Sequence, residues 1–469
     1  MKCRTPAFHA VWTLVLPCLF SVSLPGQGSA QTQCDRSPIL VRHTSVWSPV
    51  GATQDRDVLF ENDSIASIRP GGTMTPSPQT RILDGRGQTL LPGLVDLHLH
   101  FGVPGGLPEF DPPLPSTHWG ITGRQLLRSG VTSGRIHFTS LAAGESIKKD
   151  AADPCSALPR LQVGGPGMAG GIPDTERPNY VGVKSADDAV AKVRQVAEAG
   201  LEWIAVDDAD EFLPGELQAL TTAARNSGIR LMGAANRAEE LEALLVTGVD
   251  TIDYIDTSMA TRYPDRLLRR LQDSPQVTLV PTIGYHYRIH AFEGNGHLLE
   301  ARSNYEFLTP AERAFVWSNA RVALKKDPYI VNSRRVYPAL RTKFQQLLAT
   351  GTSIATGTDV GSACHFQSGG IWWELEAWRA FGAGSRQALT AATAAGARVL
   401  RDERAGALKE GAYADFVLYS GDAEKGAFDL GRVRAVAKAG VLFLKDGEWV
   451  GPREDGKYVA GRRWRASML

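Results

Sequence analysis

Two histidines at the end of an apolar segment are the first residues of this chain whose types and spacing could do chemistry. The segment reads LLPGLVDLHLHFG and carries His98 and His100, separated by one residue. In a β-strand the side chains at positions i and i+2 point to the same face. Both imidazoles would therefore emerge together at the carboxyl end of the strand, which is how a protein builds half of a metal site.

An aspartate far along the chain offers a third ligand. Residues 353–361 read SIATGTDVG, a short apolar segment that ends in Thr358 and Asp359. Two imidazole nitrogens and one carboxylate leave coordination positions open, as in catalytic rather than structural zinc sites. The same ligand set suits ferrous iron. A histidine pair at this spacing also occurs in half-buried strands without a metal, so the spacing alone does not decide.

The order of the segments along the chain resembles the amidohydrolase superfamily, and within it the imidazolonepropionase-like and prolidase-like enzymes. The segments that carry the resemblance are LLPGLVDLHLH, ATGTDVG, ALTAATAAGARVL and EGAYADFVLY. The resemblance implies an α/β fold: a (β/α)₈ TIM barrel with a small β-sandwich domain formed by both chain ends. It makes His98 and His100 metal ligands on the first barrel strand. It makes Asp359, on the eighth strand, both a metal ligand and the catalytic residue that takes the proton of a water molecule.

The chain departs from the family pattern at three other ligand positions. The lysine of the fourth strand aligns with Ala205, and the histidines of the fifth and sixth strands align with Ala234 and Tyr254. In the family the lysine bridges two metals and those histidines hold the second one. The departures therefore remove one site as a unit, and we expect one divalent metal, zinc first, with iron or manganese as alternatives.

Three residues are candidates for the substrate pocket. Tyr254 could donate a hydrogen bond in place of the second metal, Asn236 is a polar residue after the fifth strand, and His286 follows the seventh strand. Each has an ordinary structural alternative. A tyrosine at a strand end usually packs, and histidines in a long loop, as expected for His286, usually face solvent.

Other residues near the predicted site have weaker claims. The acidic run that contains Asp207, Asp208 and Asp210 could supply a replacement carboxylate, but such a run before a helix is more typical of capping. Cys364 follows Asp359 closely and could act as a nucleophile, although the sequence shows no third group to orient it.

Short apolar segments alternate with amphipathic stretches between about Leu90 and Leu400, which predicts a parallel sheet with helical crossovers. The strand candidates are GVTSGRIHF, LEWIAV, GIRLMG, DTIDYI, VTLVPT and SIATGT, and the clearest helix candidates are SADDAVAKVRQVAEAG, GELQALTTAARNSG and RAEELEALLVTG. An open doubly wound sheet alternates in the same way, and only the resemblance favours the barrel. We expect the barrel over residues 91–404 and the small β-domain over residues 31–90 and 405–469.

The amino terminus has the pattern of a signal peptide. Lys2 and Arg4 precede the apolar stretch VWTLVLPCLFSVSL, and small residues follow at positions 28–30. We expect residues 1–30 to be removed, the mature protein to be periplasmic or secreted, and no stable membrane anchor to remain; an uncleaved anchor is the alternative. The mature chain keeps Cys34, Cys155 and Cys364, which allow at most one disulfide, and the sequence does not choose the pair.

Composition excludes some classes of partner. The chain has 469 residues, 43% of them hydrophobic, with a formal net charge of +1 and no basic cluster of the kind that holds a phosphate backbone. We therefore expect a small-molecule substrate and no nucleic acid, and the sequence leaves homo-oligomerisation open.

Three functional hypotheses follow from the sequence. The first is a metal-dependent hydrolase that cleaves an amide-type C–N bond of a small molecule, non-peptide or dipeptide-like, with a single metal that activates water. The second is a catalytically inactive protein of the same fold that binds a related ligand in the periplasm. The third is a hydrolase that uses another catalytic group, such as Cys364. Retention of His98, His100 and Asp359 together favours the first.

Overall fold

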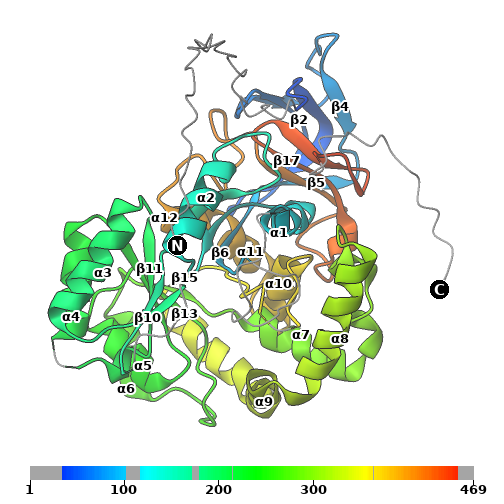
Figure 1. Ribbon diagram of the computed structural model, residues 1–469. Helices are drawn as coiled ribbons and strands as arrows, with labels where there is room; N and C mark the ends of the chain where they lie inside the picture. The colour runs from blue at the N-terminus through cyan, green and yellow to red at the C-terminus, as the bar shows by residue number, and fades with distance from the viewer. Residues whose placement is uncertain (1–33, 102–116, 172–178, 214, 363, 453–469) are drawn as a thin grey trace, which may run out of the picture.

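The computed structural model describes residues 34–101, 117–171, 179–213, 215–362 and 364–452 (Figure 1). The predicted signal peptide, residues 1–30, lies outside the described residues. Within these ranges, no helix combines the length and the apolar character needed to cross a bilayer.

Both ends of the described chain contribute to one antiparallel-rich β-sheet, drawn in blue and in orange to red at the top of Figure 1. In the described residues the sheet has nine strands in the order β19-β18-β17-β16-β5-β1-β2-β3, with β4 paired to β1. The strands are β1 (Ile39–Val46), β2 (Thr53–Glu61), β3 (Ser64–Pro70), β4 (Arg81–Asp84), β5 (Gln88–Pro92), β16 (Phe416–Ser420), β17 (Val433–Lys438), β18 (Val441–Lys445) and β19 (Glu448–Trp449). The structure differs from the expected β-sandwich in one respect: hydrogen bonds join all of these strands into a single sheet. Side chains from both chain ends nevertheless share one apolar core, in which the rings of Phe60 and Phe416 lie 4.5 Å apart.

The middle of the chain forms parallel strands. One sheet consists of β6 (Leu94–Leu99), β7 (Val131–Ile136) and β8 (Arg160–Val163). A second sheet has the order β10-β9-β11-β12-β13-β14-β15. Its strands are β9 (Gly167–Ala169), β10 (Tyr180–Gly182), β11 (Trp203–Asp207), β12 (Arg230–Ala234), β13 (Thr251–Asp253), β14 (Thr278–Val280) and β15 (Ser353–Ile354). Isolated parallel bridges join the two sheets, from Gly164 to Trp203 at one edge and from Leu99 to Val360 at the other.

Helices follow the parallel strands. They are α1 (Thr117–Arg128), α2 (Leu141–Ala151), α3 (Ala186–Glu198), α4 (Glu216–Asn226), α5 (Ala238–Leu245), α6 (Asp265–Gln272), α7 (Ile283–Gly294), α8 (Pro310–Lys326), α9 (Pro328–Ala349), α10 (Gly370–Ala380), α11 (Ser385–Thr390) and α12 (Gly396–Leu400). The helix candidates of the sequence coincide with α3, α4 and α5. In α3 the Ser185 side chain accepts a hydrogen bond from the Asp188 amide, which caps the first turn. After its last turn Gly200 adopts a φ of 66°, which stops the helix.

Side chains of the parallel strands alternate between two apolar layers, as the period of a strand requires. On β11, Ile204 and Val206 belong to the large core shared with the helices. Trp203 and Ala205 point the other way and pack with Met232 of β12 in a small interior cluster. The same face of β11 carries Asp207 at its carboxyl end. The alternation therefore decides which side chains of each strand reach the site described below.

The described cysteines settle the pairing that the sequence left open. Cys34 and Cys155 form a disulfide with a Cα–Cα distance of 5.5 Å, and Cys364 is a buried free thiol. The bridge connects the start of the described chain, just before β1, to the segment between α2 and β8.

Candidate metal centre

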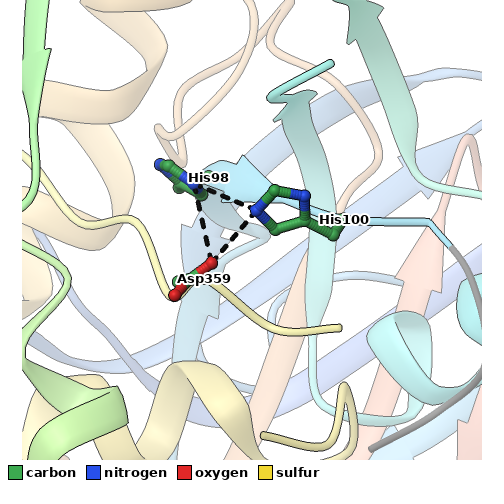
Figure 2. A group of neighbouring side chains, drawn as sticks. All are labelled: His98, His100 and Asp359. Carbon is green, nitrogen blue, oxygen red and sulfur yellow. Dashed lines mark hydrogen bonds and ion pairs between the residues drawn. The ribbon is translucent and has the colours of Figure 1, made fainter. Parts of the chain in front are cut away.

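His98 on β6 and His100, which directly follows that strand, meet Asp359 from the segment that follows β15, as Figure 2 shows. Nε2 of His98 lies 3.3 Å from Nε2 of His100, and Oδ1 of Asp359 lies 3.0 Å from Nε2 of His100 and 3.7 Å from Nε2 of His98. All three side chains are buried. The two sequence motifs that carry the predicted ligands thus meet in the structure.

Two glycines let the Asp359 segment lie directly against β6. A Cβ on Gly357 would come within 2.7 Å of the His98 Cβ, and a Cβ on Gly361 within 2.6 Å of the His100 carbonyl oxygen. The backbone of Asp359 donates to the carbonyl of His98 at 2.9 Å. Asp359 itself has a φ of 60°, a left-handed conformation that is uncommon for a residue with a side chain and that often marks a functional site.

A carboxylate inside the sheet holds the same two segments together. Asp96, two residues before His98 on β6, accepts hydrogen bonds from the backbone and hydroxyl of Thr358 at 3.0 and 2.7 Å. Burial raises the pKa of Asp96 to about 7. Asp96 therefore fixes the residue next to Asp359 relative to the strand that carries the histidines.

The triangle of ligand atoms fits a single ion. A tetrahedral zinc site with bonds of about 2.0–2.1 Å has ligand atoms about 3.3–3.4 Å apart, and the three distances of 3.0, 3.3 and 3.7 Å lie around that value. Burial lowers the pKa of His98, which favours the neutral imidazole that a metal needs. Burial would raise the pKa of Asp359, but the neighbouring histidines keep it below its usual value, which favours the carboxylate.

A second trio of potential ligands, formed by His98, His137 and Asp253, lies beside the first. Its carboxylate is already engaged: the guanidinium of Arg135 forms a close ion pair with Oδ2 of Asp253, and both side chains are fully buried. The same oxygen lies 2.8 Å from Nδ1 of His98. The fixed positive charge of Arg135 beside Asp253 disfavours a cation there. The ligand set of His98, His100 and Asp359 is therefore the better site.

Tyr254 stands where the family resemblance places a histidine of the second metal. Its hydroxyl lies 3.1 Å from Nε2 of His98, and its φ of 75° is a strained backbone conformation for a tyrosine. Tyr254 also lines the cavity above the ligands. The side chain therefore reaches the metal centre rather than packing away from it.

The other two departures from the family pattern lie in the interior of the parallel strands. Ala205 and Ala234 are buried on β11 and β12. Asp207, two residues beyond Ala205 on the same face of β11, lines the cavity. The sequence favoured a capping role for this acidic run, whereas the structure places Asp207 at the site.

His137 is a site residue that the sequence analysis missed. It follows β7 directly, and its ring stacks on His98 with a centroid distance of 4.1 Å and an interplanar angle of 20°. Burial holds the pKa of His137 well below its usual value. A signal was available, because Arg135 and His137 have the same i, i+2 spacing in a buried strand as His98 and His100.

A cavity of about 250 Å³ opens at these ligands. Asn236, one of the residues proposed from the sequence for a substrate pocket, lines it, and so do several aromatic rings. The full set of described lining residues is His100, His137, Phe138, Asn179, Tyr180, Asp207, Asn236, Tyr254, Tyr329, Asp359 and Ser362. The volume suits a small molecule.

His286 does not line this cavity, and the loop expected around it is wrong. The residue lies in helix α7, is buried, and its Nδ1 is 2.8 Å from the Ser333 hydroxyl of α9. Burial lowers its pKa to about 4, so the ring is neutral at ordinary pH. The ring contacts Tyr329, which does line the cavity, with centroids 5.9 Å apart. His286 therefore supports the wall of the pocket from behind.

Cys364 lacks the properties of a nucleophile. Its thiol is buried and donates to the Ala320 carbonyl at 3.3 Å, and burial raises its pKa to about 12. A reactive cysteine needs a lowered pKa and access to the substrate. The structure therefore argues against the hypothesis of a cysteine-based hydrolase.

Parallel strands with helical crossovers, a β-domain and a cluster of two histidines and an aspartate beside a small cavity are the arrangement expected of a metal-dependent hydrolase. Comparison with known proteins names the family. Residues 89–450 match the amidohydrolase family, so the chain belongs to that family.

Individual relatives are distant. An imidazolonepropionase of Streptomyces avermitilis is 26% identical over 384 residues, which cover 78% of this chain and 81% of that protein. A dihydroorotase of Pediococcus pentosaceus is 26% identical over 222 residues, 42% of this chain and only 49% of that protein, so the chain spans about half the length of that relative. The structure of a Xaa-Pro dipeptidase with bound methionine in the active site matches with a TM-score of 0.67 and 21% identity, over 87% of this chain and all of that one.

The family match, together with the imidazolonepropionase relative, identifies the chain as an amidohydrolase-family hydrolase of the class that acts on carbon–nitrogen bonds. The structural likeness implies a TIM-barrel-like fold with a β-domain.

Proposed function

We propose that this protein hydrolyses an amide-type C–N bond in a small molecule with a single divalent metal, zinc first, held by His98, His100 and Asp359. One observation carries the proposal: three buried ligand atoms lie 3.0–3.7 Å apart beside a cavity that a small molecule can enter. A divalent ion held by these three residues would lower the pKa of water toward about 7 and would polarise a carbonyl oxygen.

The chain's own residues supply the remaining steps. Oδ1 of Asp359 faces the histidines and accepts a hydrogen bond from the Ser362 hydroxyl at 2.8 Å. Its carboxylate then takes the proton of the attacking water and passes it to the leaving nitrogen. The Tyr254 hydroxyl, next to His98, donates a hydrogen bond to the developing oxyanion. Phe138, Tyr180 and Tyr329 restrict water and hold the substrate.

Three features support one metal rather than two. The alanines at positions 205 and 234 supply no ligand, and the Tyr254 hydroxyl occupies the space beside His98 Nε2. Arg135 already neutralises Asp253, the carboxylate of the neighbouring trio. In place of the second metal of two-metal relatives, this site therefore has the Tyr254 hydroxyl and the Arg135 guanidinium.

We also propose that the parallel strands close into a (β/α)₈ barrel over residues 91–404, with residues 31–90 and 405–469 as the β-domain. The isolated bridges between the residue after β8 and β11, and between β6 and the segment after β15, support closure. Backbone hydrogen bonds from Leu97 to Thr356 and from His100 to Val360 strengthen the second junction.

We propose export to the periplasm or the exterior after removal of residues 1–30. The disulfide between Cys34 and Cys155 supports this location, because disulfides persist in oxidising compartments. Cleavage just before position 31 would leave Cys34 in the mature protein.

Elemental analysis of protein purified without chelators tests the metal, and a substrate panel tests the chemistry. The panel contains N-acyl amino acids, cyclic imides and Xaa-Pro dipeptides, each assayed with zinc, manganese and ferrous iron. We expect about one metal per chain and turnover of at least one class. One tightly bound metal without turnover of any class would favour a periplasmic binding protein, and a chain that binds no metal would overturn the proposal.

A further inference from the structure

Two buried residues outside the ligand set, Arg135 and Asp253, control the ring of His98. We propose that they are positioning residues: Asp253 binds Nδ1 of His98 so that Nε2 faces the metal, and Arg135 holds Asp253 in place. The inference rests on the proposed function, because it assigns a task to side chains beneath the same metal centre.

The contacts of Asp253 define the orientation of the His98 ring. Oδ2 of Asp253 lies 2.8 Å from Nδ1 of His98, and Oδ1 accepts a hydrogen bond from the Thr251 hydroxyl at 2.8 Å. A carboxylate can only accept, so Nδ1 carries the hydrogen and Nε2 keeps its lone pair. Nε2 is the atom that lies among the other ligand atoms. A hydrogen bond on the far nitrogen is the usual way in which a protein orients a metal-binding histidine.

Arg135 connects this carboxylate to three strands. Besides its close ion pair with Asp253, its Nε donates to the carbonyl of Leu97 at 2.7 Å and its Nη1 donates to the Thr251 hydroxyl at 2.8 Å. Leu97 immediately precedes His98. The guanidinium also lies 4.7 Å from the ring centroid of Trp203. One side chain on β7 thus fixes the backbone of β6 next to the ligand and the carboxylate on β13.

The geometry separates this task from ordinary stabilisation of the fold. Arg135, Asp253 and His98 are fully buried. Their contacts end at Nδ1 of His98, and the other nitrogen of that ring, Nε2, is the proposed metal ligand. A guanidinium presents its donors in a rigid fork, so it restricts the carboxylate more than a lysine would. Loss of the pair should therefore reduce metal affinity beyond its effect on folding.

Zinc affinity of the apo-protein tests the inference, measured by titration of zinc ions against a chromophoric chelator. Asp253→Asn leaves a weaker acceptor for which Arg135 and His98 compete, and Asp253→Leu leaves none; we expect losses of about 10-fold and about 100-fold. Arg135→Lys keeps the charge without the fork and should fall between wild type and Asp253→Leu. The matched control is Asp415→Asn, a buried carboxylate that binds Arg160 at 3.0 Å, away from the ligands.

Unfolding midpoints of the apo-proteins and the visible spectrum of the cobalt-substituted forms complete the test. We expect Asp253→Asn and Asp415→Asn to have similar midpoints, while only Asp253→Asn changes the cobalt bands and zinc affinity. Wild-type zinc affinity in folded Asp253→Asn would overturn the inference, and this variant decides if Asp253→Leu does not fold. A wild-type protein that binds no zinc would overturn the proposed function as well, whereas a working wild-type enzyme with unaffected Asp253 variants would overturn only this inference.

Discussion

At the residue scale, the proposed function gives Asp359 two tasks that one substitution can separate. Asp359→Asn keeps an amide oxygen that can still bind a metal but cannot accept a proton. We expect turnover to fall by at least about 100-fold while most of the metal is retained. His98→Ala should lose both, because two ligands rarely hold a divalent ion. Metal content and rate are measured on the same preparations, and equal losses of both in Asp359→Asn would refute a separate role as base.

Residue patterns within single strands were enough to predict several residues of the candidate site. The histidine pair at the end of β6 and the aspartate after β15 could be predicted because each belongs to a compact motif of strand and turn. Asp253 could not, because its role depends on Arg135 and His98, which lie on other strands. The expected loop around His286 was wrong for a related reason: α7 buries residues on all sides, so it lacks the apolar stripe by which a surface helix is predicted.

At the scale of elements, the approach of the Asp359 segment to β6 depends on the absence of a side chain at position 357. A Cβ there would lie 2.4 Å from Cγ1 of Val280 and 2.7 Å from the His98 Cβ. Gly357→Ala should therefore lower the free energy of unfolding by about 1–3 kcal/mol and separate Asp359 from the histidines. Chemical denaturation and zinc titration measure the two effects. Gly384→Ala is the control, because a Cβ at that position has no neighbour within 4 Å, and equal behaviour of the two variants would contradict the prediction.

The packing of α10 against α7 predicts a dependence of stability on pH. Burial raises the pKa of Glu374 to about 8, although its carboxylate accepts from the Gly284 backbone and from Nε1 of Trp378. The folded protein therefore keeps a proton that the unfolded chain releases near its ordinary pKa of 4.5. Stability from this group is complete below about pH 4.5 and is lost as the pH rises toward 8.

The variant Glu374→Gln does not titrate at this position. Between pH 5.5 and 7.5, wild type should lose about 2–3 kcal/mol of unfolding free energy relative to Glu374→Gln, measured by urea denaturation at each pH. Other buried acids, such as Asp96, are common to both proteins and cancel in the difference. A constant difference across this range would show that Glu374 is ionised in the folded state.

At the scale of the whole molecule, periodicity left the choice between a barrel and an open sheet undecided, and the family resemblance favoured the barrel. Alternation of strands and helices suits a barrel and an open sheet equally. The bridges that join the two parallel sheets involve single residue pairs, which no sequence pattern predicts. Both ends of the described part of the chain lie in one sheet because β5 pairs with β16 over five residue pairs. Such a pairing across more than 300 residues is set by tertiary packing rather than by local propensity.

The disulfide should contribute substantially to the stability of this arrangement. It joins residues separated by 121 positions, and closure of a loop of that length in the unfolded chain corresponds to about 4–5 kcal/mol in the chain-entropy model. We expect Cys34→Ser with Cys155→Ser to lower the free energy of unfolding by about 2–5 kcal/mol. A reducing agent should bring wild type to the same level and leave the double variant unchanged. Cys364→Ser is the control, because this thiol is unpaired and should leave the sensitivity to reductant intact. If wild type unfolds at the same denaturant concentration with and without reductant, the bridge does not constrain the protein in solution.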